Sequence, residues 1–297
     1  MSSVEIEGRR LGLTNLDKVL WPEAGLRKRD LIEYYVRTAP FLLPHLEGRP
    51  LTLRRFPDGV EGVSWHQNEC RGEPEWLHVF DTSGVGGRPL RFCVVDDLAS
   101  LVWVANQAAI ELHPFQWVVE APRRPTTLVF DLDPGPPAGL VECARVALHL
   151  RELLTEVGLT SFAKTSGSLG LHLHVPLGRP HDAERLKAIA KGFGMVLAER
   201  FPELVVAEVK KAERPGKVYL DWLQNDATRQ TVAPYSLRGM PWPSVATPVT
   251  WEEVERATAD ARPESLVFLA EHVVERLDRD GDLFADVLEL EQSLPRV

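Results

Sequence analysis

The sequence has no apolar run that approaches the roughly 20 residues needed to cross a bilayer, so a membrane-spanning helix is not expected. The N-terminus lacks the basic start and apolar stretch of a secretory signal peptide. Only three cysteines occur, Cys70, Cys93 and Cys143, and no two of them form a C-x-x-C pair. Their odd number and wide spacing argue against a disulfide framework or a structural zinc site. We therefore expect a cytoplasmic protein in a reducing compartment, without membrane association.

Repeats, low-complexity tracts and Gly/Ser linkers are also absent from the 297 residues. We expect one domain over 1–297, built of two closely packed modules, with an acidic helical tail from about residue 250. The chain has no excess of basic charge either, because its net charge is −9. From Trp251 to Val297 there are 13 acidic and 5 basic side chains, a balance of −8, which leaves −1 for the rest. The excess of acidic side chains is thus confined to the tail, and nucleic-acid binding by the remaining chain is not excluded.

Helical and strand-like apolar spacings alternate along the chain, which predicts an α/β or mixed α+β architecture. Apolar residues spaced three and four positions apart predict helices over 28–38, 96–110, 140–157, 182–200 and most of the chain after 250. Asp96 or Asp97 is expected to cap the second of these helices. Alternating or β-branched runs predict strands over 49–57, 116–119, 126–133, 161–164, 171–176, 205–209 and 217–222.

The most informative segment is the apolar run that ends in Asp131-Leu132-Asp133-Pro134-Gly135. Side chains alternate along a strand, so Asp131 and Asp133 should share one face while Leu132 points into a core. Pro134 and Gly135 stop the strand and leave the two carboxylates at its rim. Neighbouring like charges are costly unless a cation lies between them, and a divalent ion is the usual one. The alternative is a strand end followed by a turn with solvated aspartates.

Asp221 lies in an apolar strand on the same face as Tyr219. A carboxylate there is costly unless it is paired or bound to a metal. It is therefore a candidate third ligand, with a salt bridge as the alternative.

A Gly-rich segment with hydroxyl residues joins two predicted strands at 165–171. Its backbone N–H groups and the hydroxyls of Ser166 and Ser168 can line an anion. His172 and His174 follow on one strand face, so both can point at the same site. The alternative is a tight hairpin turn with two ordinary histidines.

Arg238 and His113 are further candidates. Arg238 ends a short extended run and can clamp a phosphate with its forked donors, unless it is a plain surface arginine. His113 is predicted to end the buried helix just before Pro114, where a helix-capping role is the alternative.

Together these motifs resemble the polymerase domain of bacterial ligase D, in the archaeo-eukaryotic primase superfamily. The resemblance runs from about Leu13 to Leu294, through segments 15–22, 28–35, 48–50, 106–113, 131–135, 165–172, 221–225 and 233–238. It implies a primase-polymerase fold of mixed and antiparallel sheets flanked by helices. The matching domain is often fused to a ligase and a nuclease, so a stand-alone version or an excised domain is expected here.

The resemblance implies a DNA-templated nucleotidyltransferase that adds ribo- or deoxyribonucleotides to a primer 3′-hydroxyl by a two-metal mechanism. It implies gap filling and end processing during double-strand break repair by non-homologous end joining. Asp131, Asp133 and Asp221 match the catalytic carboxylates that hold two Mn²⁺ or Mg²⁺ ions. The candidate nucleotide-binding residues are His113, Ser166, Ser168, His172, Gln224 and Arg238. Those for the 5′-phosphate of a downstream strand are Asn15, Lys18 and Lys28.

The sequence also departs from the family pattern. Relatives usually have a lysine that touches the triphosphate where this chain has Leu169, so nucleotide affinity is expected to be weaker or Arg238 to carry more of the load. They have paired phenylalanines where Trp65 and His66 stand, and a basic residue in the strand that holds Arg54. Arg54, Trp65 and His66 are therefore the candidates for template and DNA binding, with Trp65 able to stack on a base.

The implied partners are gapped or broken DNA with a 5′-phosphate, nucleoside triphosphates and, as in relatives, Ku or a DNA ligase. We expect a monomer that works at the nucleoid. Two alternatives remain, a primase that starts strands de novo and a catalytically weak module that bridges DNA ends. Asp278-Arg-Asp-Gly-Asp282 is similar to a calcium loop, but Leu283 stands where the loop needs glycine, which predicts a turn between tail helices.

Overall fold

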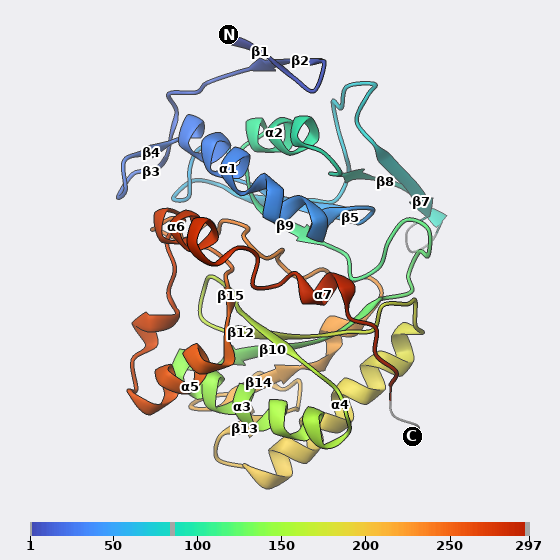
Figure 1. Ribbon diagram of the computed structural model, residues 1–297, viewed down its shortest axis with the longest axis vertical. Helices are drawn as coiled ribbons and strands as arrows, with labels where there is room; N and C mark the ends of the chain where they lie inside the picture. The colour runs from blue at the N-terminus through green and yellow to red at the C-terminus, as the bar shows by residue number, and fades with distance from the viewer. Residues whose placement is uncertain (1, 84–86, 295–297) are drawn as a thin grey trace. The chain divides into compact units, whose positions relative to one another are not determined.

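The computed structural model describes residues 2–83 and 87–294, and the chain folds into two compact units (Figure 1). Unit 1 comprises residues 1–120, 230–245 and 269–281. Unit 2 comprises residues 121–229, 246–268 and 282–297. The acidic tail is thus divided, because 269–281 belongs to unit 1 while the segments on either side of it belong to unit 2.

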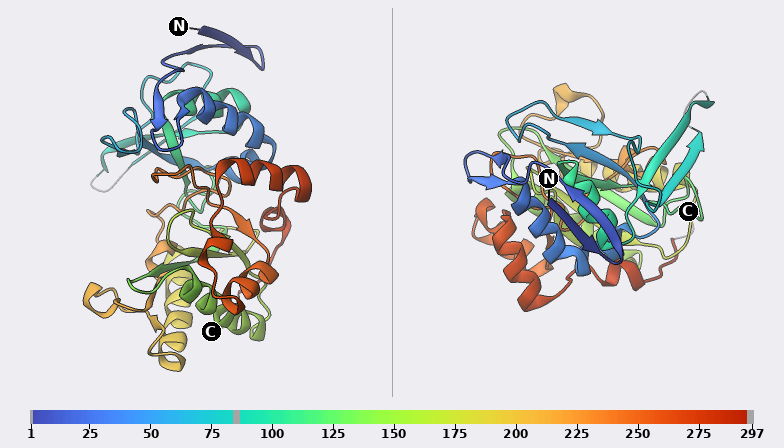
Figure 2. Two further views of the ribbon diagram at one scale, coloured as in Figure 1. Left: turned by 90° about the vertical axis from the view of Figure 1, so that its left-hand side faces the viewer. Right: turned by 90° about the horizontal axis from the view of Figure 1, so that it is seen from above.

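Unit 1 is organised around an antiparallel sheet in which β5 is central and pairs with β6, β8 and β9, and β7 pairs with β8. The sheet strands are β5 (Pro50–Arg55), β6 (Trp65–Gln67), β7 (Val79–Ser83), β8 (Pro89–Val94) and β9 (Ala109–Pro114). Two small hairpins precede them, β1 (Ser2–Ile6) with β2 (Arg9–Leu13), and β3 (Val19–Trp21) with β4 (Leu26–Arg27). Figure 2 shows β7 and β8 as a two-stranded arm of this unit.

Helices α1 (Lys28–Leu46) and α2 (Leu98–Asn106) pack against each other, and Figure 1 shows both on one side of β5 and β9. Helix α6 (Ala270–Asp280) packs against α1. The prediction for 28–38 is confirmed, and the helix continues to Leu46 through two prolines. Asp97 caps α2 by accepting a hydrogen bond from the Ser100 backbone N–H at 2.8 Å, as one of the two predicted caps.

The predicted helix over 96–110 is wrong at its end, because α2 stops at Asn106 and β9 begins at Ala109. Ala108, with φ of 57°, turns the chain between them. His113 therefore lies on a strand and not at a helix terminus. The apolar run continues from helix into strand, and a buried strand cannot be distinguished from a buried helix by periodicity alone.

Unit 2 contains a six-stranded sheet in the order β13-β14-β10-β12-β11-β15. Only β13 pairs in parallel, with β14, and every other pairing in this sheet is antiparallel. The strands are β10 (Thr127–Pro134), β11 (Phe162–Thr165), β12 (Leu171–Pro176), β13 (Val205–Val206), β14 (Val218–Asp221) and β15 (Pro248–Val249).

The helices of unit 2 are α3 (Leu140–Glu156), α4 (Ala183–Arg200), α5 (Trp251–Ala259) and α7 (Asp286–Glu289), with short 3₁₀ turns η2 (Lys211–Glu213), η3 (Trp222–Asn225) and η4 (Pro263–Leu266). Helices α3, α4 and α5 bury one face of the sheet, whereas α7 contacts β12 and contributes no residue to that core. Figure 1 shows α3 and α4 on the same side of β10 and β14. Leu128, Phe130 and Leu132 point into the core that these helices share with the sheet, as predicted. The intervening positions of β10 therefore face the other way.

The ends of these helices follow local rules. Gly158, with φ of 77°, lies just past α3, where only a residue that tolerates the left-handed region ends a helix at little cost. Asp182 caps α4 by accepting from the Arg185 backbone N–H at 2.8 Å. Gly281, with φ of 69°, ends α6, and a turn follows at 283–285, so the turn predicted for the segment similar to a calcium loop is present.

Three other predictions are wrong. Residues 116–119 form no strand, since Gln116 and Trp117 lie in a bend after β9. The strand predicted over 205–209 is only two residues long. Cys70 and Cys93 form a disulfide, contrary to the expectation from their spacing. The Cys70 backbone N–H donates to the Arg91 carbonyl at 2.7 Å and brings a loop residue beside β8, a contact that sequence spacing does not reveal.

Every helix among the described residues is too short or too polar to span a bilayer.

Candidate functional site

The three predicted carboxylates lie on two neighbouring strands, β10 and β14, in the interior of the unit 2 sheet. In the antiparallel pair of β10 and β14, Asp131 lies directly opposite Asp221, and Asp133 lies opposite Tyr219. Residues that face each other across such a pair have Cβ atoms about 5 Å apart and share a face. Because Leu132 points into the core, all three carboxylates lie on the face opposite to α3 and α4.

The electrostatics of these side chains reflect their crowding. Partial desolvation and the negative charges of Asp131 and Asp221 raise the pKa of Asp133 to about 7. Desolvation and the charge of Asp131 also raise the pKa of Asp221. Arg214 opposes the shift at Asp133 without cancelling it. Since Asp133 is exposed at the rim, solvent screens part of this repulsion, and the cost to stability is smaller than for a buried cluster.

Neighbouring donors orient two of the carboxylates. The Gln224 side-chain amide donates to Asp131 Oδ2 at 3.3 Å, and His172 Nε2 lies 3.2 Å from Asp131 Oδ1. Asp221 Oδ1 accepts from the Tyr219 hydroxyl at 3.2 Å and from the Leu223 backbone N–H at 3.0 Å. Gln224 and Leu223 belong to η3, so the turn after β14 holds both strands' carboxylates in place.

An oxygen-only set of three like charges suits a hard divalent cation. Within residues 2–83 and 87–294, no three His, Cys, Asp or Glu side chains are already arranged around a common ion position. The hydrogen-bond donors named above hold the carboxylates instead.

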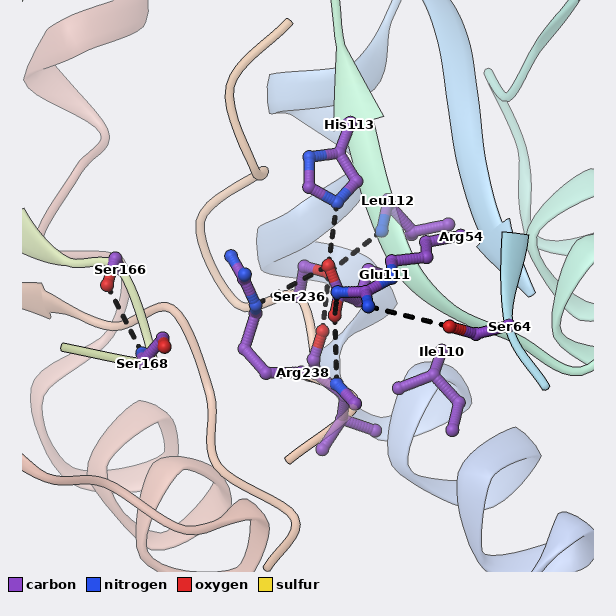
Figure 3. Close-up of polar contacts among 12 residues, drawn as sticks. Arg54, Ser64, Ile110, Glu111, Leu112, His113, Ser166, Ser168, Ser236 and Arg238 are labelled. Carbon is purple, nitrogen blue, oxygen red and sulfur yellow. Dashed lines mark hydrogen bonds and ion pairs between the residues drawn. The ribbon is translucent and has the colours of Figure 1, made fainter. Parts of the chain in front are cut away.

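The Gly-rich segment is a hairpin turn between β11 and β12. The Ser166 backbone N–H donates to the Gly170 carbonyl at 2.9 Å. The Ser166 hydroxyl accepts from the backbone N–H groups of Ser168 at 3.2 Å and Gly170 at 3.0 Å, the first of which Figure 3 draws. The tight turn of the alternative interpretation is therefore present, and Ser166 rather than an anion receives these two N–H groups. Leu169 projects from the turn and is 61% exposed.

The two strand histidines share a face, as predicted, but have different surroundings. His172 lies opposite Asp131 in the pairing of β12 with β10, which explains its contact with that carboxylate. His174 packs edge-on against Phe284, with ring centroids 5.2 Å apart. His172 thus contacts one of the predicted metal ligands.

In unit 1, the other candidates converge on Glu111, a buried residue of β9 (Figure 3). His113 Nε2 donates to Glu111 Oε2 at 2.8 Å, and Arg238 Nε lies 3.5 Å from the same oxygen. Arg54 Nη1 and the Gly239 backbone N–H donate to Glu111 Oε1 at 3.1 and 3.0 Å. One carboxylate thus orients a histidine and two arginines.

Close packing holds two segments around Glu111 in place. A Cβ atom at Gly239 would collide with the Phe56 ring, so only glycine brings its N–H to Glu111. The Ser236 hydroxyl accepts from the Leu112 backbone N–H at 3.0 Å and holds β9 beside the segment that carries Arg238.

The surroundings of Glu111 strongly favour its ionised form over its protonated form. Burial opposes ionisation, but the His113 hydrogen bond, the Arg238 charge and the Gly239 N–H together lower the pKa of Glu111 to about 2. Burial lowers the pKa of His113 despite the adjacent carboxylate, so the ring is neutral at pH 7. Burial likewise lowers the pKa of His66, whose ring lies 5.8 Å from that of His113.

We expect Glu111→Gln to destabilise the protein by about 3 kcal/mol at pH 7, because Arg54 and Arg238 lose their common counter-charge. The depressed pKa of Glu111 contributes stability that is present above pH 4.5 and is lost as the pH falls toward 2. The difference between variant and wild type in thermal unfolding should therefore shrink over that pH range. The exposed Glu199→Gln is the matched control, and an equal effect of both changes would contradict the role of Glu111.

Lys18, Lys28 and Asn15 gather near the N-terminal end of α1. Lys28 is buried, and its Nζ donates to the Thr14 carbonyl oxygen at 2.7 Å. Burial and the nearby charges of Arg55 and Lys18 lower the pKa of Lys28 to about 8. Lys18 Nζ pairs with Asp58 Oδ1 at 2.6 Å. Lys18 and Asn15 line an open cavity of about 730 Å³.

The three candidates for DNA binding lie on neighbouring strands. Arg54 faces His66 and Arg55 faces Trp65 in the pairing of β5 with β6. Trp65 is 42% exposed, and the Arg55 guanidinium lies 5.5 Å from the centre of its ring. An exposed ring backed by a cation can stack on a base, whereas Arg54 is committed to Glu111.

Two residues with central contacts, Glu111 and Lys164, were not predicted as site residues. Lys164 is completely buried in β11, and its Nζ lies 3.0 Å from His172 Nδ1. Both are charged residues inside short apolar strands, the same signal that identified Asp221.

Comparison with known proteins gives consistent matches. Residues 27–284 match the family described as LigD, primase-polymerase domain. The "Multifunctional non-homologous end joining protein LigD" of Mycolicibacterium smegmatis is 39% identical over 282 residues, which is 93% of this chain and 36% of that protein. The "Bifunctional non-homologous end joining protein LigD" of Bacillus subtilis is 32% identical, over 96% of this chain and 45% of that protein. The chain thus spans less than half the length of these two relatives.

A solved structure shares the whole fold. The "Polymerase Domain from Mycobacterium tuberculosis Ligase D in complex with DNA" has a TM-score of 0.88 and 37% sequence identity, and the match covers 95% of this chain and 99% of that one. The mixed sheets and flanking helices expected from the sequence are confirmed by this likeness.

Proposed function

The chain belongs to the LigD primase-polymerase domain family, and we propose that it is a DNA-templated nucleotidyltransferase of double-strand break repair by end joining. It extends a primer 3′-hydroxyl with nucleoside triphosphates, including ribonucleotides, at gaps or ends. The observation that carries this proposal is the register that places Asp221 opposite Asp131, with Asp133 on the same face.

We assign the binding of two Mn²⁺ or Mg²⁺ ions to Asp131, Asp133 and Asp221. Such ions, when bound, neutralise the triphosphate and lower the pKa of the attacking hydroxyl. The protein's own part is positioning. Gln224 and the Leu223 N–H hold the carboxylate oxygens, so that less reorganisation is needed during the reaction.

For the nucleotide, we assign Ser166, Ser168, His172 and Gln224 as donors, together with the side chains of His113 and Arg238. A guanidinium suits a triphosphate because its forked donors can contact two oxygens. Glu111 supports this role in unit 1, since it fixes both His113 and Arg238.

For DNA, we propose that Lys18, Lys28 and Asn15 bind the 5′-phosphate of a downstream strand. Three observations support this, the clustering of two lysines, their proximity to Arg55 and the cavity beside Lys18. Trp65 and His66 would contact template bases, and Arg54 the backbone.

Leu169→Lys should lower the apparent KM for nucleoside triphosphate about fivefold. A lysine at this exposed turn adds one charge-assisted contact to phosphate, worth about 1 kcal/mol. Steady-state extension with Leu169→Met as the uncharged control measures the effect. An unchanged KM would mean that another cation, such as Arg238, already neutralises that phosphate.

The test of the function is extension of a 5′-labelled primer across a short gap, with Mn²⁺ and a single ribonucleoside triphosphate. Templated addition of the complementary nucleotide supports the proposal. Binding of DNA without extension would favour an end-bridging module, and products from unprimed template would favour a primase.

The remaining assignments follow from the proposed reaction. The protein acts as a monomer in the bacterial cytoplasm, at the nucleoid, together with Ku or a DNA ligase that seals the filled gap.

A further inference from the structure

A row of polar residues crosses four neighbouring strands of the unit 2 sheet. Lys164 of β11 lies opposite His172 of β12, His172 lies opposite Asp131 of β10, and Asp131 lies opposite Asp221 of β14. Facing residues share a face, so all four side chains lie on the face away from α3, α4 and α5. Lys164 stands at the far end of this row from Asp221.

Lys164 is unusual because its side chain is fully buried, with a relative exposure of 0%. Lysine is almost never completely buried unless it is paired, since transfer of an ammonium from water is costly. Its Nζ lies 3.0 Å from His172 Nδ1, within hydrogen-bond distance. A solvated surface role is therefore excluded for this lysine.

The two ring nitrogens of His172 face groups of opposite character. As an ammonium, Lys164 can only donate, and in this pair Nδ1 is then the acceptor. A carboxylate can only accept, so Nε2, at 3.2 Å from Asp131 Oδ1, must carry the hydrogen. The hydrogen bond that one ring nitrogen makes decides the state of the other.

We propose that Lys164 is a positioning residue that fixes His172 as the neutral Nε2–H tautomer and so makes its outward nitrogen an obligate donor. In this state the ring orients Asp131 when no substrate is present, and it can offer the same N–H to a phosphate oxygen. The consequence for nucleotide addition rests on the proposed function, whereas the tautomer does not.

The tautomer can be measured directly by long-range ¹H–¹⁵N correlation on the metal-free protein labelled with ¹⁵N-histidine. His172→Gln identifies the His172 signals among the 9 histidines. We expect a protonated Nε2 and an unprotonated Nδ1 for His172 in the wild-type protein. A Nδ1–H tautomer or an imidazolium there would overturn the proposal, whatever the protein's activity.

Lys164→Met, which keeps the length of the side chain but removes the donor, should give a mixture of His172 tautomers. Mn²⁺ affinity, followed by titration of the paramagnetic signal, should fall about 10-fold, as is typical when a supporting partner of a ligand is lost. Lys164→Arg restores a donor and should recover most of the Nε2–H tautomer and most of the Mn²⁺ affinity. Lys187→Met removes a lysine of α4 that pairs with Asp226 and should change neither the tautomer nor the affinity.

The outcomes separate the two proposals. If the tautomer is as expected but no variant extends a primer, the proposed function fails and Lys164 keeps its role. If extension proceeds but His172 has the same tautomer with and without Lys164, the role of Lys164 is wrong. If Lys164→Met does not fold, an Nδ1–H tautomer or an imidazolium in the wild-type spectrum still overturns the proposal, and Lys164→Arg still tests whether a donor at this position maintains the tautomer.

Discussion

Replacement of both Asp131 and Asp133 by alanine is expected to reduce primer extension by about 10³-fold or more, with the fold retained. The two side chains lie at the rim of β10 on the face opposite the core, so their loss removes no apolar contact. Their loss also removes mutual repulsion, which together with the larger effect of desolvation raises the pKa of Asp133 to about 7 and that of Asp221 above its usual value. The metal-free double variant should therefore be at least as stable as the wild-type protein.

The measurement is single-turnover extension on gapped DNA, together with thermal unfolding with and without Mn²⁺. Saturating Mn²⁺ should raise the melting temperature of the wild-type protein, because a ligand that binds only the folded state stabilises it by mass action. It should leave the double variant unchanged. Asp260→Asn, at the exposed end of α5, is the matched control. Extension at wild-type rates by the double variant would exclude these carboxylates from the reaction.

How much of the site the sequence predicted depends on how local each signal is. The shared face of Asp131 and Asp133 follows from the two-residue period of a strand, and the core position of Leu132 follows from the same rule. The strand end at Pro134 is also a local property. The meeting of Asp131 with Asp221 is not local. The need of a carboxylate in an apolar strand for a partner made Asp221 a candidate, and the family resemblance placed it with Asp131 and Asp133.

Glu111 and Lys164 also needed partners for the same reason, although neither was predicted as a site residue. Both are charged residues in apolar strands, and both proved to be buried with several donors or acceptors around them. A charged residue within an apolar strand is thus a useful signal even without a recognised motif. Its partner, however, comes from another strand or loop, and spacing along the chain does not identify that partner.

The errors have a common origin in non-local structure. The run after Asp97 remains apolar through Leu112, so periodicity could not place the turn at Ala108. Cys70 and Cys93 are 23 residues apart and meet only because a loop lies beside β8. The sequence suggested two modules but not their boundaries, since each unit is assembled from three separate segments.

Replacement of both Lys18 and Lys28 by methionine should erase the preference for a gap with a 5′-phosphate over one with a 5′-hydroxyl. We expect a preference of about tenfold in the wild-type protein, since charge-assisted contacts to phosphate are worth about 1.5–3 kcal/mol each before competing contacts are lost. To bind the phosphate, Lys18 must give up its ion pair with Asp58. Lys28 must likewise give up its hydrogen bond to Thr14. The rate on the hydroxyl-ended gap should change little.

The preference for a 5′-phosphate should also fall as the pH rises above about 8. Burial and neighbouring positive charge lower the pKa of Lys28 to about 8, so its ammonium is present below pH 8 and is lost above it. A bound phosphate dianion favours the protonated form, which means that phosphate affinity is complete below pH 8 and falls as the pH rises further. The phosphate itself has its second pKa near 6 and does not change charge over this range.

Extension rates on the two gaps, compared at pH 7 and pH 9, measure this effect. The ratio of rates should fall toward one at pH 9 in the wild-type protein and should be near one at both pH values in the double variant. Arg200→Met, which removes an exposed cation at the end of α4, should leave the ratio unchanged at either pH. A phosphate preference that survives in the double variant would show that Lys18 and Lys28 only stabilise the surroundings of α1, through Asp58 and Thr14.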